Sequence, residues 1–188
     1  MLLILLPLCG NIDYVLGLWL VDVPAHTANF VVLVLLYSLL DGILTPIAIG
    51  VFAQGEIKAY EIALCIIYAV NFIASYVCLK LGMAPETVFV LNIAFKACVL
   101  ADLLVHSKAK YAFPVHAFLK QCLLPSAVVF VLSGAFTYFM PWETPNSFWE
   151  FLLHTLAIII CTSLMALAIG MTKGERLFLK KTCGIRLQ

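Results

Sequence analysis

The sequence predicts an all-α polytopic membrane protein: a bundle of five full transmembrane helices with a partial sixth at the N-terminus. Of its 188 residues, 64% are hydrophobic and only 11% are charged, and the mean hydropathy is +1.11. A soluble domain has about 25% charged residues, so this chain has too few of them to cover a surface in water. The apolar residues also form runs of about 20 residues, the length that a helix needs to cross the hydrocarbon core.

Five such runs are each long enough to span the membrane alone. They are expected at residues 29–53, 59–79, 87–105, 122–140 and 151–171. A shorter run at residues 1–8 is expected to be the end of a membrane helix, so we interpret the chain as a fragment or a shortened reading frame. The amphipathic stretch that follows it contains Trp19, and tryptophan favours the membrane interface, so a short surface segment is expected there. Residues 1–188 are thus predicted to form a single membrane domain.

The basic residues of the connections lie almost entirely on one side of the predicted bundle. Lys80 is the only one on the other side, and Lys96 lies inside a predicted span. Under the positive-inside rule the basic side, which includes the C-terminus, is cytoplasmic. The residues on that side are Lys58, Lys108, Lys110, Lys120, Lys173, Arg176, Lys180, Lys181 and Arg186.

This sidedness gives a first testable prediction. A topology reporter fused after Lys110 or Gln188 is expected to read cytoplasmic, and one inserted at Pro145 is expected to read the opposite side. The physical reason is the bias of lysine and arginine toward the cytoplasmic loops. Two sites with the reverse readout would overturn the topology.

No motif in the sequence points to catalysis. The seven cysteines are scattered, without a CxxC pair or a Cys/His cluster, so neither a zinc site nor a disulfide framework is expected. There is no glycine-rich phosphate loop, and the charged loops are too short to form a soluble catalytic domain. We therefore expect no enzyme, no metal, no cofactor and no nucleic-acid partner.

Charged residues inside the predicted spans are the main candidates for function. A central aspartate costs about 2.5–3.5 kcal/mol to insert, so such residues usually face a bundle interior or an aqueous cavity. At 1.5 Å per residue, Asp41 lies about 24 Å and Lys96 about 18 Å below the outer ends of their helices, so the two charges are expected at similar depth and could pair. Asn92 lies one turn before Lys96, and Asp102 lies nearer the cytoplasm. Structural pairing and a role in a solute path are both open for these four residues.

Milder polar residues also recur at helical spacing. Tyr68, Asn71 and Ser75 share one face of the second span, a pattern more often explained by ordinary hydrogen bonds between helices. In the first span, Pro46 removes a backbone hydrogen bond and predicts a kink, because proline lacks an N–H group. Gly42 and Gly50 lie four residues to either side of Pro46, and small residues there favour close helix packing.

Four ordered segments resemble a known family: "ILLPLCGNIDYVLGLWLVDVPAHTANFVVL", "DGILTPIAIGVFAQGEIKAYEI", "SYVCLKLGMAPETVF" and "IGMTKGERLFL". They are similar to four parts of bacterial polysaccharide (O-antigen) flippases. These parts are the stretch after the seventh helix, the eighth helix with its end, the ninth-to-tenth hairpin and the close after the twelfth helix. The resemblance covers essentially the whole chain but only the second half of the family's usual length.

The resemblance implies the multidrug/oligosaccharidyl-lipid/polysaccharide exporter fold, in which two six-helix bundles rock around a central cavity. This chain would be the C-terminal bundle, with the first bundle absent. The implied substrate is an undecaprenyl-diphosphate-linked oligosaccharide, flipped across the bacterial inner membrane for surface polysaccharide and lipopolysaccharide synthesis. Lys96 would then be the best intramembrane partner for the diphosphate. Asp102 departs from an anion-binding pattern.

Two other functions remain open at this stage. One is half of a cation-coupled multidrug antiporter of the same fold, with Asp41 as the coupling carboxylate. The other is a non-transporting membrane remnant or assembly subunit. For either transporter, the expected partners are the lipid bilayer and a separately supplied N-terminal half or a second copy of the chain.

Overall fold

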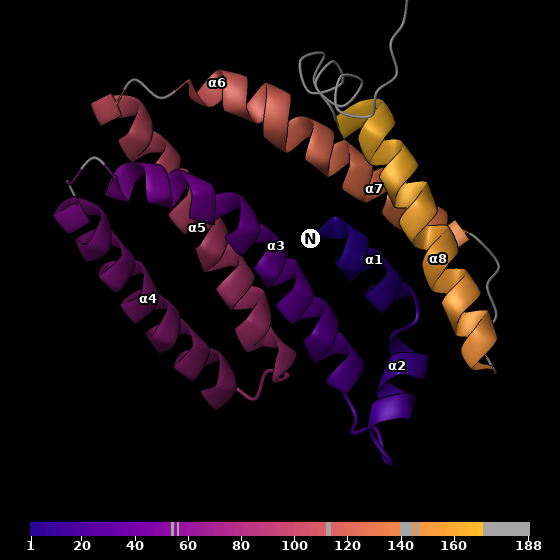
Figure 1. Ribbon diagram of the computed structural model, residues 1–188. Helices are drawn as coiled ribbons and strands as arrows, with labels where there is room; N and C mark the ends of the chain where they lie inside the picture. Colours follow the sequence, from indigo (N-terminus) through magenta and orange to yellow (C-terminus); the bar gives the residue numbers. More distant parts are fainter. Residues whose placement is uncertain (54, 56, 112–113, 140–144, 146, 171–188) are drawn as a thin grey trace, which may run out of the picture. The chain divides into compact units, whose positions relative to one another are not determined.

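The computed structural model describes residues 1–53, 55, 57–111, 114–139, 145 and 147–170 (Figure 1). The described residues are helical apart from short turns and connections, which confirms the predicted all-α class. Five helical segments are long and apolar enough to cross a membrane, and they match the five predicted spans. The largest difference is in the fourth, which begins at Val115 rather than at residue 122. The chain is therefore a multi-pass membrane protein.

The chain forms two compact units. The first consists of Met1 and Leu20–Pro114, and the second consists of Leu2–Trp19 and Val115–Gln188. Each unit has its own packed helices and is described by itself below. The single membrane domain expected from the sequence stays a prediction.

The first unit contains α3 (Thr27–Phe52), α4 (Ile57–Lys80) and α5 (Glu86–Tyr111). Helix α5 packs against both of the others and lies between them (Figure 1). Its central position explains why Val99 and Leu103 have no exposed surface. Helix α4, by contrast, is apolar, and no residue of its most apolar stretch is buried, as expected of a helix whose outer face meets lipid.

Helices α3 and α5 run in the same direction, although α4 lies between them in the sequence. Side-chain contacts between the two helices occur in the same order along both chains, which only a parallel pair can produce. These contacts, from the amino-terminal ends onward, are His26–Glu86, Phe30–Phe89 and Asp41–Lys96. We call this parallel contact the α3–α5 seam.

Helix α3 continues through Pro46 to Phe52 without a break. Its buried side chains beyond Asp41 are Leu44, Ile47, Ala48 and Val51. The face that carries Gly42, Pro46 and Gly50 is exposed instead, and a Cβ atom at Gly50 would meet no described atom within 4 Å. The expected close packing at Gly50 was therefore wrong within the described residues, because the larger aliphatic side chains form the packed face. The kink at Pro46 stays a prediction.

The second unit brings the start of the chain together with its last two predicted spans. Helix α1 (Leu2–Gly10) packs against α7 (Leu124–Phe139) and α8 (Phe148–Met165). The short helix α6 (Val115–Phe118) and a π-helical turn lead into α7, and a second π-helical turn follows α8. A Cβ atom at Gly10 would lie 2.7 Å from Thr137 Cγ2 on α7, so only glycine allows this close approach.

The partial first helix and the expected surface segment are separated by a sharp bend. Helix α2 (Ile12–Trp19) is turned by 80° from α1. Asn11 lies at the bend, is buried, and donates a hydrogen bond from Nδ2 to the carbonyl oxygen of Pro7 at 3.1 Å. In α2, Leu16 is buried while Trp19 is exposed, so this helix is amphipathic and suits the predicted surface segment.

Candidate functional site: an ion pair on the α3–α5 seam

An ion pair in the first unit joins two charged residues that the sequence analysis expected at similar depth inside the membrane. Lys96 Nζ lies 2.6 Å from Asp41 Oδ1, which confirms that the two residues are close enough to pair. The Lys96 side chain is only 8% exposed, whereas that of Asp41 is 48% exposed. The expectation that both head groups face the interior therefore holds for Lys96 only, because Asp41 lies at the edge of the seam.

Tyr37 gives the same ammonium a second stabilising contact. Lys96 Nζ lies 5.0 Å from the centroid of the Tyr37 ring, within the range of a cation–π interaction. Tyr37 and Asp41 are one turn apart on α3, so both reach the lysine of α5 from one helix face. The sequence reasoning missed Tyr37, although its spacing from Asp41 was the signal that could have identified it.

Asn92 belongs to a different contact. Asn71 Nδ2 on α4 donates a hydrogen bond to Asn92 Oδ1 on α5 at 2.6 Å, and Ser75 Oγ lies 3.5 Å from Asn71 Oδ1. Interhelical hydrogen bonds of this kind stabilise helix pairs in membranes by about 0.6–2 kcal/mol each. Asn92 therefore links α5 to α4, while Lys96 links α5 to α3.

Asp102 is half-buried on α5, beyond Lys96 in the direction of the predicted cytoplasmic end. Neither of the two ion pairs observed in the described part of the chain includes it. It is therefore separate from the Asp41–Lys96 pair. The roles of Asp41, Lys96, Asn92 and Asp102 in a transport path stay predictions.

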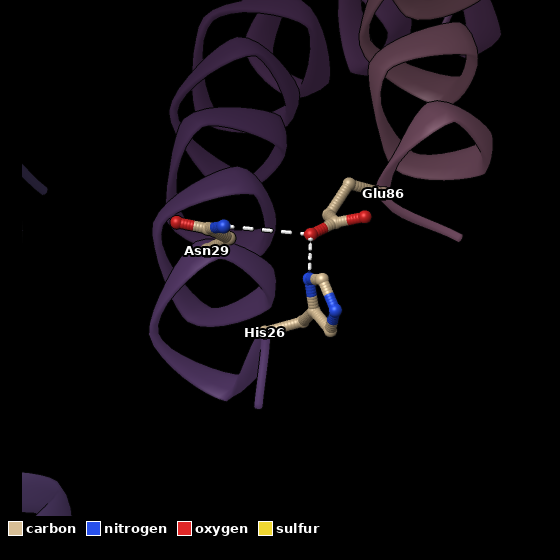
Figure 2. Close-up of polar contacts among 3 residues, drawn as sticks. All are labelled: His26, Asn29 and Glu86. Carbon is tan, nitrogen blue, oxygen red and sulfur yellow. Dashed lines mark hydrogen bonds and ion pairs between the residues drawn. The ribbon is translucent and has the colours of Figure 1, made fainter. Parts of the chain in front are cut away.

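A second charged contact closes the amino-terminal end of the seam. Figure 2 shows that Glu86, the first residue of α5, points toward His26 and Asn29 at the start of α3. Glu86 Oε1 contacts His26 Nδ1, and the contact is an ion pair when the imidazole is protonated. The same oxygen accepts a hydrogen bond from Asn29 Nδ2 at 3.4 Å. The sequence reasoning missed this cluster, because its members come from two separate loop–helix junctions and meet only when α3 and α5 are neighbours.

The second unit contains an open cleft of about 360 Å³ between α1, α7 and α8. Its polar groups are partly engaged within the protein, since Asn11 Nδ2 donates to Pro7 and Thr137 Oγ1 donates to the Ser133 carbonyl. Across the described ranges, no three His, Cys, Asp or Glu side chains are grouped to hold a metal. The cleft is lined by Leu6, Cys9, Gly10, Asn11, Gly134, Thr137, Tyr138, His154 and Ile158.

Comparison with known proteins gave no match: no family model, no curated protein and no solved structure matches the chain. The similarity to polysaccharide flippases therefore rests on the four sequence segments alone. The fold and the geometry of the Asp41–Lys96 pair do not depend on that similarity. They describe a multi-pass helical membrane protein in which one buried lysine is neutralised by a half-exposed aspartate.

Proposed function

We propose that this chain is half of a transporter that flips a lipid-linked oligosaccharide across the bacterial inner membrane, with its C-terminus in the cytoplasm. The observation that carries the proposal is the Asp41–Lys96 pair within two apolar helices of spanning length. Ionisable residues at membrane depth are costly and usually mark substrate or ion paths. The four flippase-like segments support the choice of substrate.

The geometry suggests how the pair would serve such a substrate. Lys96 is neutralised by Asp41 in this arrangement, so the buried cation has a counter-charge. A diphosphate brings its own negative charge and is able to replace the Asp41 carboxylate, which is the more accessible member of the pair. The aspartate then acts as an internal competitor, and substrate binding becomes an exchange of one anion for another.

A cation-coupled antiporter is the second candidate, and one observation favours it. Nearly half of the Asp41 side chain is exposed, so a proton or a metal cation has access to the carboxylate. Neutralising Asp41 would weaken its attraction for Lys96 and free the α3–α5 seam to rearrange. In this function the aspartate, rather than the lysine, is the indispensable group.

The two functions are distinguished in a strain that lacks its polysaccharide flippase and carries this chain with a co-expressed N-terminal half. Under the flippase proposal, Lys96→Gln abolishes surface polysaccharide, because a neutral amide cannot replace the cation that holds a diphosphate. Lys80→Gln serves as a matched control, since Lys80 is exposed at the end of α4. Membrane abundance of each variant is measured by immunoblot.

Three results would count against the flippase proposal. One is normal surface polysaccharide in a stably inserted Lys96→Gln variant, and another is no polysaccharide from the unmodified pair. The third is drug resistance that requires Asp41 but leaves polysaccharide unaffected, which would support the antiporter.

A further inference from the structure

We propose that His26, Asn29 and Glu86 form a pH-sensitive clasp that fastens the amino-terminal ends of α3 and α5. We call these three residues the terminal clasp (Figure 2). The proposal does not rest on the transported substrate, because it concerns only how one end of the α3–α5 seam is held. Three features of the cluster support it.

The first feature is the backbone of His26. Its φ of 72° and ψ of −8° lie in the left-handed region, which is unfavourable for residues other than glycine and persists only where the surroundings enforce it. His26 occupies the N-cap position of α3, yet its side chain makes no capping hydrogen bond. Its ring is directed at Glu86 on the neighbouring helix instead, so the contact with Glu86 is part of what holds this conformation.

The second feature is the environment of the Glu86 carboxylate. Oε1 contacts His26 Nδ1 and accepts a hydrogen bond from Asn29 Nδ2. Oε2 is buried and has no hydrogen-bond partner among the described residues. The backbone N–H of Glu86 at the start of α5 stabilises the charged carboxylate, and His26 adds to this. The buried Oε2 still lacks a donor, which favours a positive charge close by. A protonated imidazole supplies that charge, whereas a neutral imidazole supplies at most one hydrogen bond. Acid conditions therefore tighten the clasp, and alkaline conditions loosen it.

The third feature is that the charged residues nearest to His26 and Glu86 along the chain make no ion pair with them among the described residues. These are Asp22, four residues before His26, and Lys80, six residues before Glu86. Both are exposed, and neither takes part in an ion pair within the described ranges. His26 and Glu86 are thus the two titratable groups whose ionisation decides the contact.

The terminal clasp lies at the end of the α3–α5 seam, so its release affects the contacts that follow along the two helices. The Phe30 and Phe89 rings, with centroids 5.3 Å apart, form the next contact along the seam, and the Asp41–Lys96 pair lies deeper. An open crevice of about 410 Å³, lined in part by Asn29 and Glu86, already lies beside the clasp. Releasing the clasp extends this crevice between the helix ends, so pH controls access to the seam from this end.

Hydrogen–deuterium exchange on the full chain in lipid nanodiscs tests this proposal. Exchange rates are compared at about pH 5.5 and about pH 8.0, one on each side of the pH range in which histidine changes charge. The rates are first corrected for the intrinsic pH dependence of amide exchange. Amides at the starts of α3 and α5 are expected to be protected several-fold more strongly at the lower pH. His26→Asn should abolish this difference without unfolding the chain, because asparagine tolerates the left-handed conformation but cannot carry a positive charge. Glu86→Gln should abolish it as well.

His116→Asn is the matched control, because His116 is exposed on α6 in the second unit and should leave the effect unchanged. Equal protection of the wild-type helix ends at both pH values would overturn the proposal. So would a His26→Asn or Glu86→Gln variant that keeps the wild-type difference. The wild-type comparison decides the matter by itself if either variant fails to insert.

Discussion

Replacing Asp41 with alanine is expected to destabilise the first unit by about 3 kcal/mol, because it leaves a buried ammonium without its counter-charge. Lys96 is almost fully buried, so it cannot regain solvation by a small rotation. The Tyr37 ring remains nearby but offsets only about 0.5–2 kcal/mol of that loss. The free energy of unfolding, measured by denaturant titration of the detergent-solubilised chain, reports the effect.

A double-mutant cycle that adds a Lys96 substitution tests whether the loss of stability comes from the Asp41–Lys96 pair. Lys96→Met removes the buried charge but keeps most of the side-chain volume, so it should restore much of the stability lost in the Asp41→Ala background. Asp22→Ala is the control, because Asp22 is exposed, and its effect should stay within about 0.5 kcal/mol. A null effect of Asp41→Ala, or no rescue by Lys96→Met, would show that the pair does not stabilise the seam.

The second large effect concerns the chain without a partner: expressed alone in a flippase-deficient strain, it is expected to restore no surface polysaccharide. Alternating access requires a second body to rock against, and the resemblance implies that this body is an N-terminal bundle. The half-exposed Asp41 carboxylate would also meet lipid, which offers no hydrogen bonds. Self-association or rapid degradation is the expected fate of the unpartnered chain.

Co-expression of an N-terminal half provides the comparison. Surface polysaccharide should return only when both halves are present, and the abundance of this chain in the membrane should rise with it. Polysaccharide restored by this chain as a demonstrated monomer would contradict the prediction. An N-terminal half expressed alone is the control for residual activity of that half.

The sequence was sufficient for the helices and for the similar depth of Asp41 and Lys96, but not for their pairing, which requires α3 and α5 to be neighbours. Hydropathy located the five spans, because the cost of exposing a backbone to lipid leaves few alternatives to a helix. The distance of each residue from the outer end of its helix predicted that Asp41 and Lys96 lie at similar depth. Successive spans alternate in direction, so the first and third spans run the same way and the depths of the two residues can be compared. The structure shows that the two side chains are in contact.

The remaining contacts depend on which helices are neighbours, and periodicity does not contain that information. Asn92 and Lys96 are one turn apart, yet one contacts α4 and the other contacts α3, because α5 lies between the two helices. His26 and Glu86 lie near helix ends, outside the centres of the spans. Charged residues are common at such positions, so nothing in the sequence singled them out. Gly50 lies in a pattern of small residues that suggested packing, but larger aliphatic neighbours form the buried face.

The parallel arrangement of α3 and α5 also imposes an order on biosynthesis. A ribosome that adds about 5–20 residues per second needs roughly 3–11 seconds to travel from Asp41 to Lys96. Throughout that interval the first helix of the seam has been made but its lysine partner has not. The nascent aspartate therefore lacks its counter-charge until α5 is complete. Release of α3 and α4 into lipid before then would leave a helical hairpin with an unneutralised carboxylate, a natural substrate for membrane quality control.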